Sequence, residues 1–138
     1  MRIMFDTNVF DKMLSSADDV EIIVACTSND YFITSVQKEE LANIRDENKK
    51  YALLEMCTIV AKATPTPAVV GYSKVGDCVL VDLEDIYSDL LTETHSNVKD
   101  AMIGSAAKRE LCTVVTNDIR FSKRLINCHI PTMTYEDF

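Results

Sequence analysis

Arg2-Ile3-Met4-Phe5-Asp6-Thr7-Asn8 is the stretch that decides the fold. Its apolar run ends abruptly in an acid and two small polar residues, a pattern typical of a buried strand that delivers a carboxylate to its C-terminal end. In open α/β sheets, ligands bind beyond the carboxyl ends of parallel strands, so Asp6 is placed for chemistry. Asp6 could also serve only as the N-cap of the following helix, because Asp, Thr and Asn all favour that position. The stretch alone leaves both interpretations open.

The length and composition indicate one globular domain. A chain of 138 residues can bury roughly two thirds of its unfolded surface in a single core. Hydrophobic residues at 47% and charged residues at 26% are ordinary for a soluble protein. With Gly 3 and Pro 3, the chain has little material for a flexible linker. We therefore expect a single domain over residues 1–138.

The net charge of −8 argues against a protein that binds nucleic acid by general basicity. Neutralisation of phosphates by Lys and Arg supplies most of that kind of affinity. The charge does not exclude nucleic acid, because acids that cluster around divalent cations make a site electropositive once metal is bound. The acidity is therefore also a signal for metal.

The cysteines and histidines favour neither disulfides nor zinc. Five cysteines is an odd number, they lack any C-x-x-C spacing, and most stand among apolar neighbours, which predicts buried free thiols. His95 and His129 are far in sequence from any paired cysteines, so a zinc site is not expected.

The sequence also points to the cytoplasm. Asp6 would fall inside the apolar core of a signal peptide, and no run approaches the ~18 apolar residues of a membrane span. Unpaired thiols fit a reducing compartment. We expect a cytoplasmic protein that does not contact a membrane.

The order of elements predicts an α/β protein with parallel strands. The first strand, helical segments and a second strand at Tyr31–Thr34 form the βαβ unit of a parallel sheet. Residues 69–81 have no clear period, and we expect a strand or loop excursion there. The remaining expected elements are helices at 9–14, 20–25, 35–46, 48–63, 82–91, 98–110 and 119–126, and strands at 112–116 and 130–134.

Glu40 lies on a helix face that should point into the core. It stands four residues after Val36 and four before Ile44, so the three share one stripe, whereas Glu39 should be solvated. A carboxylate on a buried face is costly unless a cation or proton pairs with it. The alternative is an exposed glutamate on a broad helix face.

Two further acids stand in comparable positions near the C-terminal end of the chain. Asp100 shares a helical stripe with Ile103, Ala107 and Leu111. The strand Cys112–Thr116 ends in Asn117-Asp118, which repeats the arrangement at Asp6. We call Asp6, Glu40, Asp100 and Asp118 the acidic quartet.

The acidic quartet could meet only at the C-terminal edge of one parallel sheet. Carboxylates in contact raise one another's pKa, so such a cluster is tolerable only with protons or cations present. Oxygen ligands without cysteine or histidine select Mg²⁺ or Mn²⁺. Two such ions ~3.5–4 Å apart can hold a phosphodiester, activate water and stabilise the leaving oxygen. The pattern therefore predicts a nuclease.

At this point the sequence resembles the PIN-domain family, and most closely its single-domain VapC-like toxins. The resemblance spans nearly the whole chain, and its motifs occur in family order. No single motif is specific, but all four stand on the expected elements. They are Phe5-Asp6-Thr7-Asn8, Glu40-Leu41, Lys99-Asp100-Ala101-Met102-Ile103, and Val115-Thr116-Asn117-Asp118 with Phe121.

The resemblance implies a three-layer α/β/α sandwich with a mainly parallel sheet. It also implies a Mg²⁺- or Mn²⁺-dependent endoribonuclease that uses the acidic quartet, as the toxin of a type II toxin–antitoxin pair. Asn8 and Thr116 match polar residues that would support the acids through hydrogen bonds. RNA is the implied substrate, and a cognate antitoxin and a second copy of the chain are the implied partners. The match is poor over residues 69–81, which leaves substrate choice open.

Two surfaces have further interpretations. Arg120, Lys123 and Arg124 could contact the RNA backbone beside Asp118, or could simply form a solvated helix face. The helix 48–63 carries more large apolar residues than a small sheet needs, which favours a homodimer interface.

Two rival functions remain. An aspartyl-phosphate phosphatase would use Asp6 as nucleophile, but the second Asp usual two residues later is Asn8, and Glu40 would be unexplained. The other rival is a catalytically weak or inactive PIN-like module that binds RNA or dimerises without turnover. Adding metal and then EDTA to the protein with labelled RNA separates these alternatives.

Overall fold

The fold is built on a sheet of parallel strands. The structure, a computed structural model, describes residues 1–69, 78–79, 87–91 and 97–138, with the backbone alone at Pro67 and Val79. Its larger sheet has the order β3-β2-β1-β6-β7, and each neighbouring pair is parallel. The strands are β1 (Arg2–Phe5), β2 (Asp30–Thr34), β3 (Lys62–Thr64), β6 (Thr113–Val115) and β7 (Thr132–Met133).

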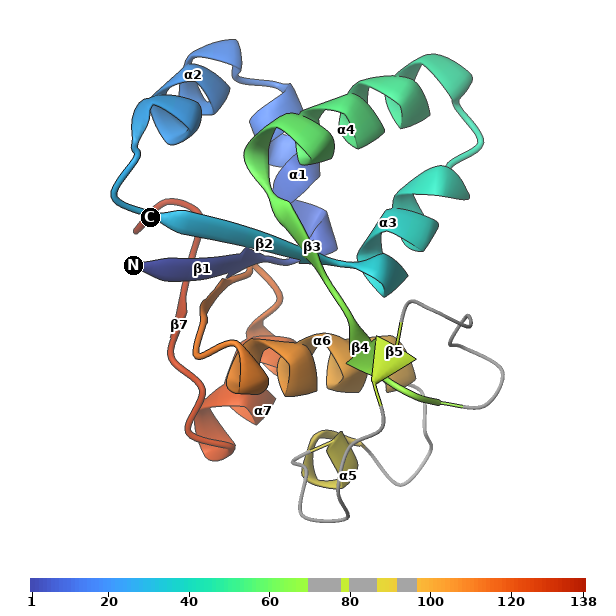
Figure 1. The fold of residues 1–138 in the computed structure, drawn as a ribbon, viewed down its shortest axis with the longest axis vertical. Helices are drawn as coiled ribbons and strands as arrows, with labels where there is room; N and C mark the ends of the chain where they lie inside the picture. Colours follow the sequence, from blue (N-terminus) through green and yellow to red (C-terminus); the bar gives the residue numbers. More distant parts are fainter. Residues whose placement is uncertain (70–77, 80–86, 92–96) are drawn as a thin grey trace.

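Helices cover both faces of this sheet (Figure 1). One face carries α1 (Thr7–Leu14), α2 (Ala17–Ala25), α3 (Ser35–Ala42) and α4 (Glu47–Val60). The other carries α6 (Val98–Arg109) and α7 (Ile119–Asn127), with α5 (Tyr87–Leu90) against α6. A separate parallel pair joins β4 (Thr66–Pro67) to β5 (Cys78–Val79). The three-layer α/β/α architecture expected from the sequence is confirmed.

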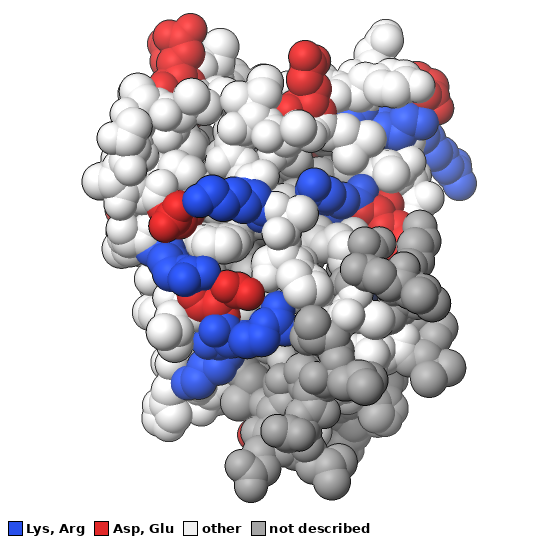
Figure 2. Space-filling model, in the orientation of Figure 1, with Lys and Arg blue, Asp and Glu red and all other residues white. Residues whose placement is uncertain are grey.

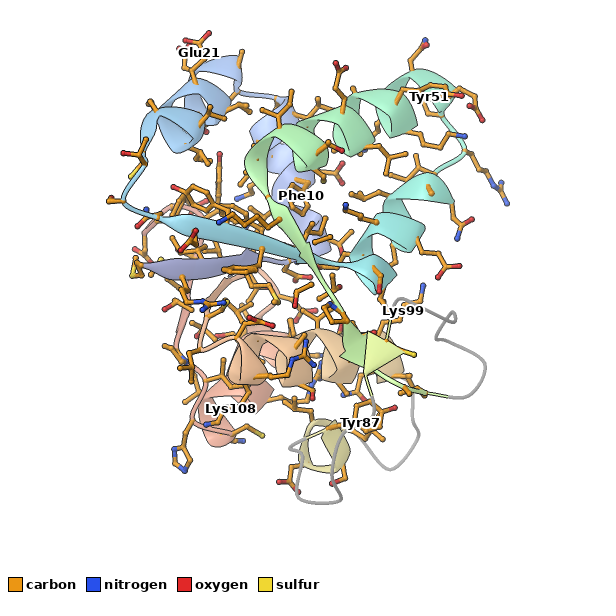
Figure 3. The ribbon with its side chains drawn as sticks, viewed as in Figure 1. Phe10, Glu21, Tyr51, Tyr87, Lys99 and Lys108 are labelled. Atoms are coloured by element: carbon orange, nitrogen blue, oxygen red, sulfur yellow. The ribbon has the colours of Figure 1, made fainter. Side chains whose placement is uncertain are left out.

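The alternation of side chains along β1 explains why the sheet is covered on both faces. Ile3 and Phe5 belong to the core under α1 to α4, whereas Met4 belongs to the core under α6 and α7. Successive strand residues point to opposite faces, and a strand buried on both faces reads as a continuous apolar run. Phe10 of α1 lies between that helix and the sheet (Figure 3), with its ring centroid 5.9 Å from that of Phe5.

The predicted helix 48–63 is wrong at its C-terminal end. The helix ends at Val60, Ala61 is extended with φ −129° and ψ 145°, and Lys62–Thr64 form β3. Pro65 biases the preceding Thr64 toward extended backbone. Pairing with β2 then overrides the helix propensity of Lys62 and Ala63.

The stripe predicted to end at Leu111 is also wrong. The helix α6 ends at Arg109, and Leu111 is 80% exposed with φ 55°. The chain must turn sharply here, because β6 begins at Thr113. The backbone N–H of Cys112 donates to Ala107 O at 2.9 Å and closes this turn.

Two regions of the sequence fall partly outside the described residues. In the predicted helix 82–91, the described part is α5, on which Asp89 is exposed as expected. In the irregular stretch 69–81, residue 69 and the short strand β5 are described. The predictions for residues 70–77 and 80–86 lie outside the described residues.

All five cysteines are free thiols. Cys57 and Cys112 are buried, whereas Cys26, Cys78 and Cys128 are half-buried rather than buried. Burial raises the pKa of the Cys57 thiol to about 12 and that of Cys112 to about 11. These two thiols stay protonated and unreactive at neutral pH.

None of the helices in the described ranges is both long enough and apolar enough to cross a bilayer.

Candidate active site

An acidic cleft lies at the C-terminal ends of the central strands. β2 and β3 extend from one side of β1, and β6 and β7 from the other, so the strand order reverses between β1 and β6. Ligands of open α/β sheets bind at such a switch point. The cleft has a volume of about 380 Å³, and its lining contains the whole acidic quartet. The lining residues are Asp6, Thr7, Asn8, Asp11, Glu40, Leu41, Ile44, Asp100 and Asp118.

Asp6 is both a helix cap and a wall of this cleft. It is 7% exposed, and its Oδ1 accepts a hydrogen bond from Thr7 N at 2.7 Å as the N-cap of α1. Its Oδ2 accepts from Asn8 Nδ2 at 2.8 Å and from Thr116 Oγ1 at 2.6 Å. Asp6 is therefore an N-cap that also lines the cleft, and its part in chemistry stays a prediction.

Burial is the main cause of the raised pKa of Asp6. The hydrogen bonds from Thr116 and Thr7 oppose the increase, and the charges of Glu40 and Asp118 add to it. Burial therefore outweighs the hydrogen bonds that favour the charged form of Asp6.

Thr116 joins the two acids that follow β1 and β6. It is 2% exposed, donates to Asp6, and accepts from Asp118 N at 3.0 Å. Asp118 itself N-caps α7, because its Oδ1 accepts from Arg120 N at 2.8 Å and Phe121 N at 3.0 Å. These bonds fix the direction of both carboxylates through the backbone of two helices.

Glu40 reaches the cleft from α3. Its side chain is 27% exposed, with Oε2 accepting from Thr7 Oγ1 at 2.7 Å and Oε1 lying 3.4 Å from Lys99 Nζ. Lys99 lies at the end of α6 nearest α3 (Figure 3). Glu39, expected to be solvated, is half-buried, because α3 packs against both α4 and α6 and little of its surface faces solvent.

Sequence reasoning missed three residues that shape this wall. Gln37 is fully buried and its Nε2 donates to Phe5 O, which ties α3 to the residue before Asp6. It also completes a capping box with Thr34, a signature that the spacing Thr34-x-x-Gln37 could have revealed. Thr7 was overlooked as a partner of Glu40. Asp11 lines the cleft and pairs with Lys49 Nζ at 2.9 Å.

Asp100 meets a cation from the next helix. Its Oδ2 accepts from Arg124 Nη2 at 2.6 Å, and the two side chains are 35% and 23% exposed. Burial raises the pKa of Asp100 to about 6, Arg124 lowers it, and the charges of the other three quartet acids raise it further. The quartet therefore acts as one electrostatic cluster.

The basic residues of α7 divide into two kinds. Arg120 and Lys123 are exposed, whereas Arg124 is turned toward Asp100. A contact of any of them with RNA remains a prediction.

The donor set fits a hard divalent cation. The cleft offers carboxylates, one hydroxyl and one amide, whose oxygens are ligands that Mg²⁺ and Mn²⁺ accept. Within the described ranges, no three acidic, histidine or cysteine side chains are already gathered around one point. Arg124 and Lys99 neutralise two of the acids instead. Binding a cation would therefore require side chains of the quartet to turn toward it.

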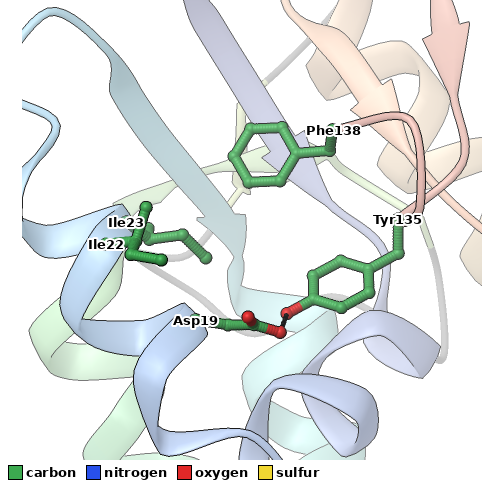
Figure 4. Close-up of a pocket in the computed structure, with 5 residues that line it drawn as sticks. All are labelled: Asp19, Ile22, Ile23, Tyr135 and Phe138. Carbon is green, nitrogen blue, oxygen red and sulfur yellow. Dashed lines mark hydrogen bonds between the residues drawn. The ribbon is translucent and has the colours of Figure 1, made fainter.

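A smaller pocket, lined by no residue of the acidic quartet, lies between α2 and the C-terminal segment (Figure 4). It has a volume of about 160 Å³ and is lined by Asp19, Ile22, Ile23, Tyr135 and Phe138. The Tyr135 hydroxyl donates to Asp19 Oδ2 at 2.6 Å, and burial raises the pKa of this phenol. The bond anchors the C-terminal segment to α2.

Comparisons with known proteins identify the fold. No family model and no curated protein sequence matches the chain. Solved structures do. The chain is similar to one in the crystal structure of VapBC2 from Rickettsia felis bound to a DNA fragment from their promoter, with a TM-score of 0.58 and 18% identity. The match covers 98% of this chain and 99% of that one.

Two other solved structures agree. VapBC-1 from nontypeable Haemophilus influenzae matches with a TM-score of 0.57 and 13% identity over 99% of both chains. FitAB bound to an IR36 DNA fragment matches with a TM-score of 0.50 and 18% identity over 96% of this chain and 94% of that one. Identities this low establish the fold alone. The PIN-like fold implied by the sequence resemblance is confirmed.

Proposed function

We propose that this chain is a Mg²⁺- or Mn²⁺-dependent endoribonuclease that hydrolyses RNA phosphodiester bonds with the acidic quartet. The observation that carries the proposal is the cleft itself. Four acids that are distant in sequence line one cavity at the switch point of the sheet. Charge repulsion among them contributes to the raised pKa values of Asp6 and Asp100. A site that gathers acids at such an energetic cost is a functional candidate.

Each acid has a distinct part in this mechanism. A divalent cation, when bound, supplies Lewis-acid stabilisation of phosphate charge and lowers the pKa of water. Asp6 and Asp118 would hold it from fixed directions, because Thr116 and two helix caps orient them. Glu40 and Asp100 would close around it from α3 and α6.

The substrate is a nucleic acid whose approach depends on the cation. The chain has a net charge of −8, and the cleft repels phosphate while its acids are ionised. On the face shown in Figure 2, basic and acidic side chains lie next to each other rather than in a basic patch. Arg120 and Lys123, exposed beside Asp118, would contact the RNA backbone.

A protein partner is part of the proposal. The similar solved structures are VapBC and FitAB complexes, which supports assignment of this chain as the toxin of a toxin–antitoxin pair. An apolar groove of about 410 Å³ lies among α1, α2 and α4. In it, Leu14 is 38% exposed and Ile59 is 59% exposed. Exposed apolar surface of this kind marks contact sites. Co-expression with the product of the adjacent open reading frame tests for an antitoxin.

A homodimer is proposed on related grounds. Tyr51 of α4 is 66% exposed and lies on the outer surface of the helix (Figure 3), and Ile59 of the same helix is 59% exposed. A monomeric mass by light scattering at micromolar concentration would contradict the dimer.

The alternative is a PIN-like module that binds RNA or dimerises without turnover. One observation favours it: the described acids are not gathered around a single point, and Arg124 and Lys99 neutralise two of them. This module would keep the cleft but have no catalytic cation.

Labelled RNA separates the two functions. We expect cleavage with Mn²⁺ or Mg²⁺, loss of cleavage with EDTA, and loss in Asp6→Asn. Metal-independent binding without cleavage would support the module instead. Release of phosphate from a small ester without RNA cleavage would point to a phosphatase.

A further inference from the structure

Arg124 is the basic residue of α7 that faces the acidic cleft. Its Nη2 lies 2.6 Å from Asp100 Oδ2, and its side chain is 23% exposed. Arg120 and Lys123 on the same helix are exposed. The ion pair joins α7, which Asp118 caps, to α6, which carries Asp100.

The guanidinium is only partly satisfied in this position. Its Nε is buried and has no hydrogen-bond partner among the described residues. Its Cζ lies 5.7 Å from the centroid of the Phe121 ring, a contact that supplies no acceptor for Nε. A buried donor without an acceptor costs free energy. The pair therefore leaves donor capacity that another acceptor, such as a phosphate oxygen, could use.

Asp100 lies within electrostatic reach of the other three acids of the quartet, and the Arg124 guanidinium is the positive charge that opposes them. Lys99 pairs with Glu40 rather than Asp100, with its Nζ 3.4 Å from Glu40 Oε1. A guanidinium on Oδ2 of Asp100 repels a divalent cation that approaches the same carboxylate, so the two positive charges compete for Asp100.

We propose that Arg124 is a built-in counter-ion that occupies Asp100 in the metal-free protein and is displaced when a divalent cation binds. The inference rests on the proposed function, because it concerns the same metal site. The released guanidinium then has its donors available for the RNA backbone. Arg124 thus lowers the affinity for metal and couples metal binding to RNA binding.

A competing role for Arg124 predicts the opposite sign. If Arg124 were a permanent brace that orients Asp100 toward the metal, its removal would weaken metal binding. If it acted only through the general electric field, any nearby cation would have a similar effect, whatever residue stands at position 100.

The test is a titration with Mn²⁺ alone, read from the electron paramagnetic resonance signal of the free ion. We expect Arg124→Gln to bind Mn²⁺ roughly three- to tenfold more tightly than the wild type, the range expected for loss of a competing, charge-assisted pair. Lys123→Gln, one residue away and exposed, is the matched control and should change the affinity by less than about twofold. Circular dichroism confirms that each variant is folded.

The variant Asp100→Asn makes the test specific. In that background, Arg124→Gln should lose its effect and match the Lys123→Gln control, because the competition has no target. If Arg124→Gln increased the affinity for Mn²⁺ equally in the wild type and in Asp100→Asn, Arg124 would act only through the general electric field. That result would overturn the proposal.

Arg124→Lys is a second variant that tests the proposal if Arg124→Gln does not fold. A lysine keeps the charge but lacks the planar fork, so its affinity for Mn²⁺ should lie between those of the wild type and Arg124→Gln. Unchanged or weaker Mn²⁺ binding in folded Arg124 variants would overturn the proposal that Arg124 is a counter-ion of Asp100. If the wild type and every variant bound no Mn²⁺, the proposed function would fail and this inference with it.

Discussion

The carboxylates at the strand ends and those on the helices of the cleft are held in different ways. We call Asp6, Thr116 and Asp118 the strand wall, and Glu40 and Asp100 the helix wall. In the strand wall, backbone N–H groups and buried side chains fix the acids. In the helix wall, the carboxylates pair with the charged side chains of Lys99 and Arg124 instead.

This difference indicates which part of the cleft is rigid before a cation binds. Acids held by caps keep their direction, because the donors are part of the helix backbone. Acids held by long basic side chains can change partner at little cost, since partly exposed ion pairs contribute little stability. The strand wall is preorganised, and the helix wall adjusts.

The largest expected effect is on catalysis at the strand wall. Asp6→Asn and Asp118→Asn should each reduce the rate of RNA cleavage roughly 10²- to 10⁴-fold, because the charge that holds the cation is lost. Glu39→Gln should change the rate little. Single-turnover cleavage of a structured RNA measures the rates, and circular dichroism checks the fold. Full activity in Asp6→Asn, or inactivity in Glu39→Gln beside an active Glu40→Gln, contradicts the assignment.

The second prediction concerns the stability of the strand wall. Thr116→Val removes the hydroxyl that links Asp6 to the N–H of Asp118 while keeping the shape of the side chain. Asp118 N then loses its acceptor and Asp6 Oδ2 keeps only its bond from Asn8, which should lower the free energy of unfolding by about 1–3 kcal/mol. Urea denaturation measures it.

Thr132→Val is the control for this variant, because its hydroxyl contacts Ser122 at 3.0 Å outside the cleft. A loss of stability no greater than that of the control would show that the strand wall is not held through Thr116.

The third prediction uses pH to compare the walls without metal. The pKa of Asp100 is raised from 3.8 to about 6, so the folded state binds more protons than the unfolded state between these values. The contribution of Asp100 to stability is therefore most favourable below pH 3.8 and falls as the pH rises toward about 6. Asp100→Asn removes this dependence.

The measurement is the free energy of unfolding in EDTA at mildly acidic and at neutral pH. The difference between Asp100→Asn and the wild type should favour the variant more at neutral pH. A difference that does not change with pH would mean that burial and the acidic neighbours do not destabilise the charged form of Asp100.

The residues of the strand wall could be predicted almost completely from the sequence. An apolar run ending in Asp6-Thr7-Asn8, and a second ending in Thr116-Asn117-Asp118, identify strand ends, because both strands are buried on two faces and read as continuous apolar segments. Parallel neighbours then bring the two acids together.

The helix wall could be predicted only in part. Helical spacing placed Glu40 and Asp100 on inward faces, but it cannot say which cation each one meets. Arg124 was expected on the solvent side or at RNA, and its pairing with Asp100 depends on how α6 and α7 pack. Gln37 was hidden because a buried amide leaves no periodic signal beyond the capping box.

The strand β3 was missed for a similar reason. Lys62-Ala63-Thr64 carries no apolar run and no alternation, since it is a short edge strand with Lys62 and Ala63 exposed. Its extended form comes from pairing with β2, a contact distant in sequence.

The most direct test of the central claim, that the acidic quartet forms one cation site, is thermal unfolding with and without millimolar Mn²⁺. A ligand that binds only the folded state raises its stability by mass action. The wild type and Lys123→Gln should both melt several degrees higher with Mn²⁺ than with EDTA, whereas Asp6→Asn should show little or no shift. Equal melting temperatures of the wild type in Mn²⁺ and in EDTA, or a full shift in Asp6→Asn, would contradict the account.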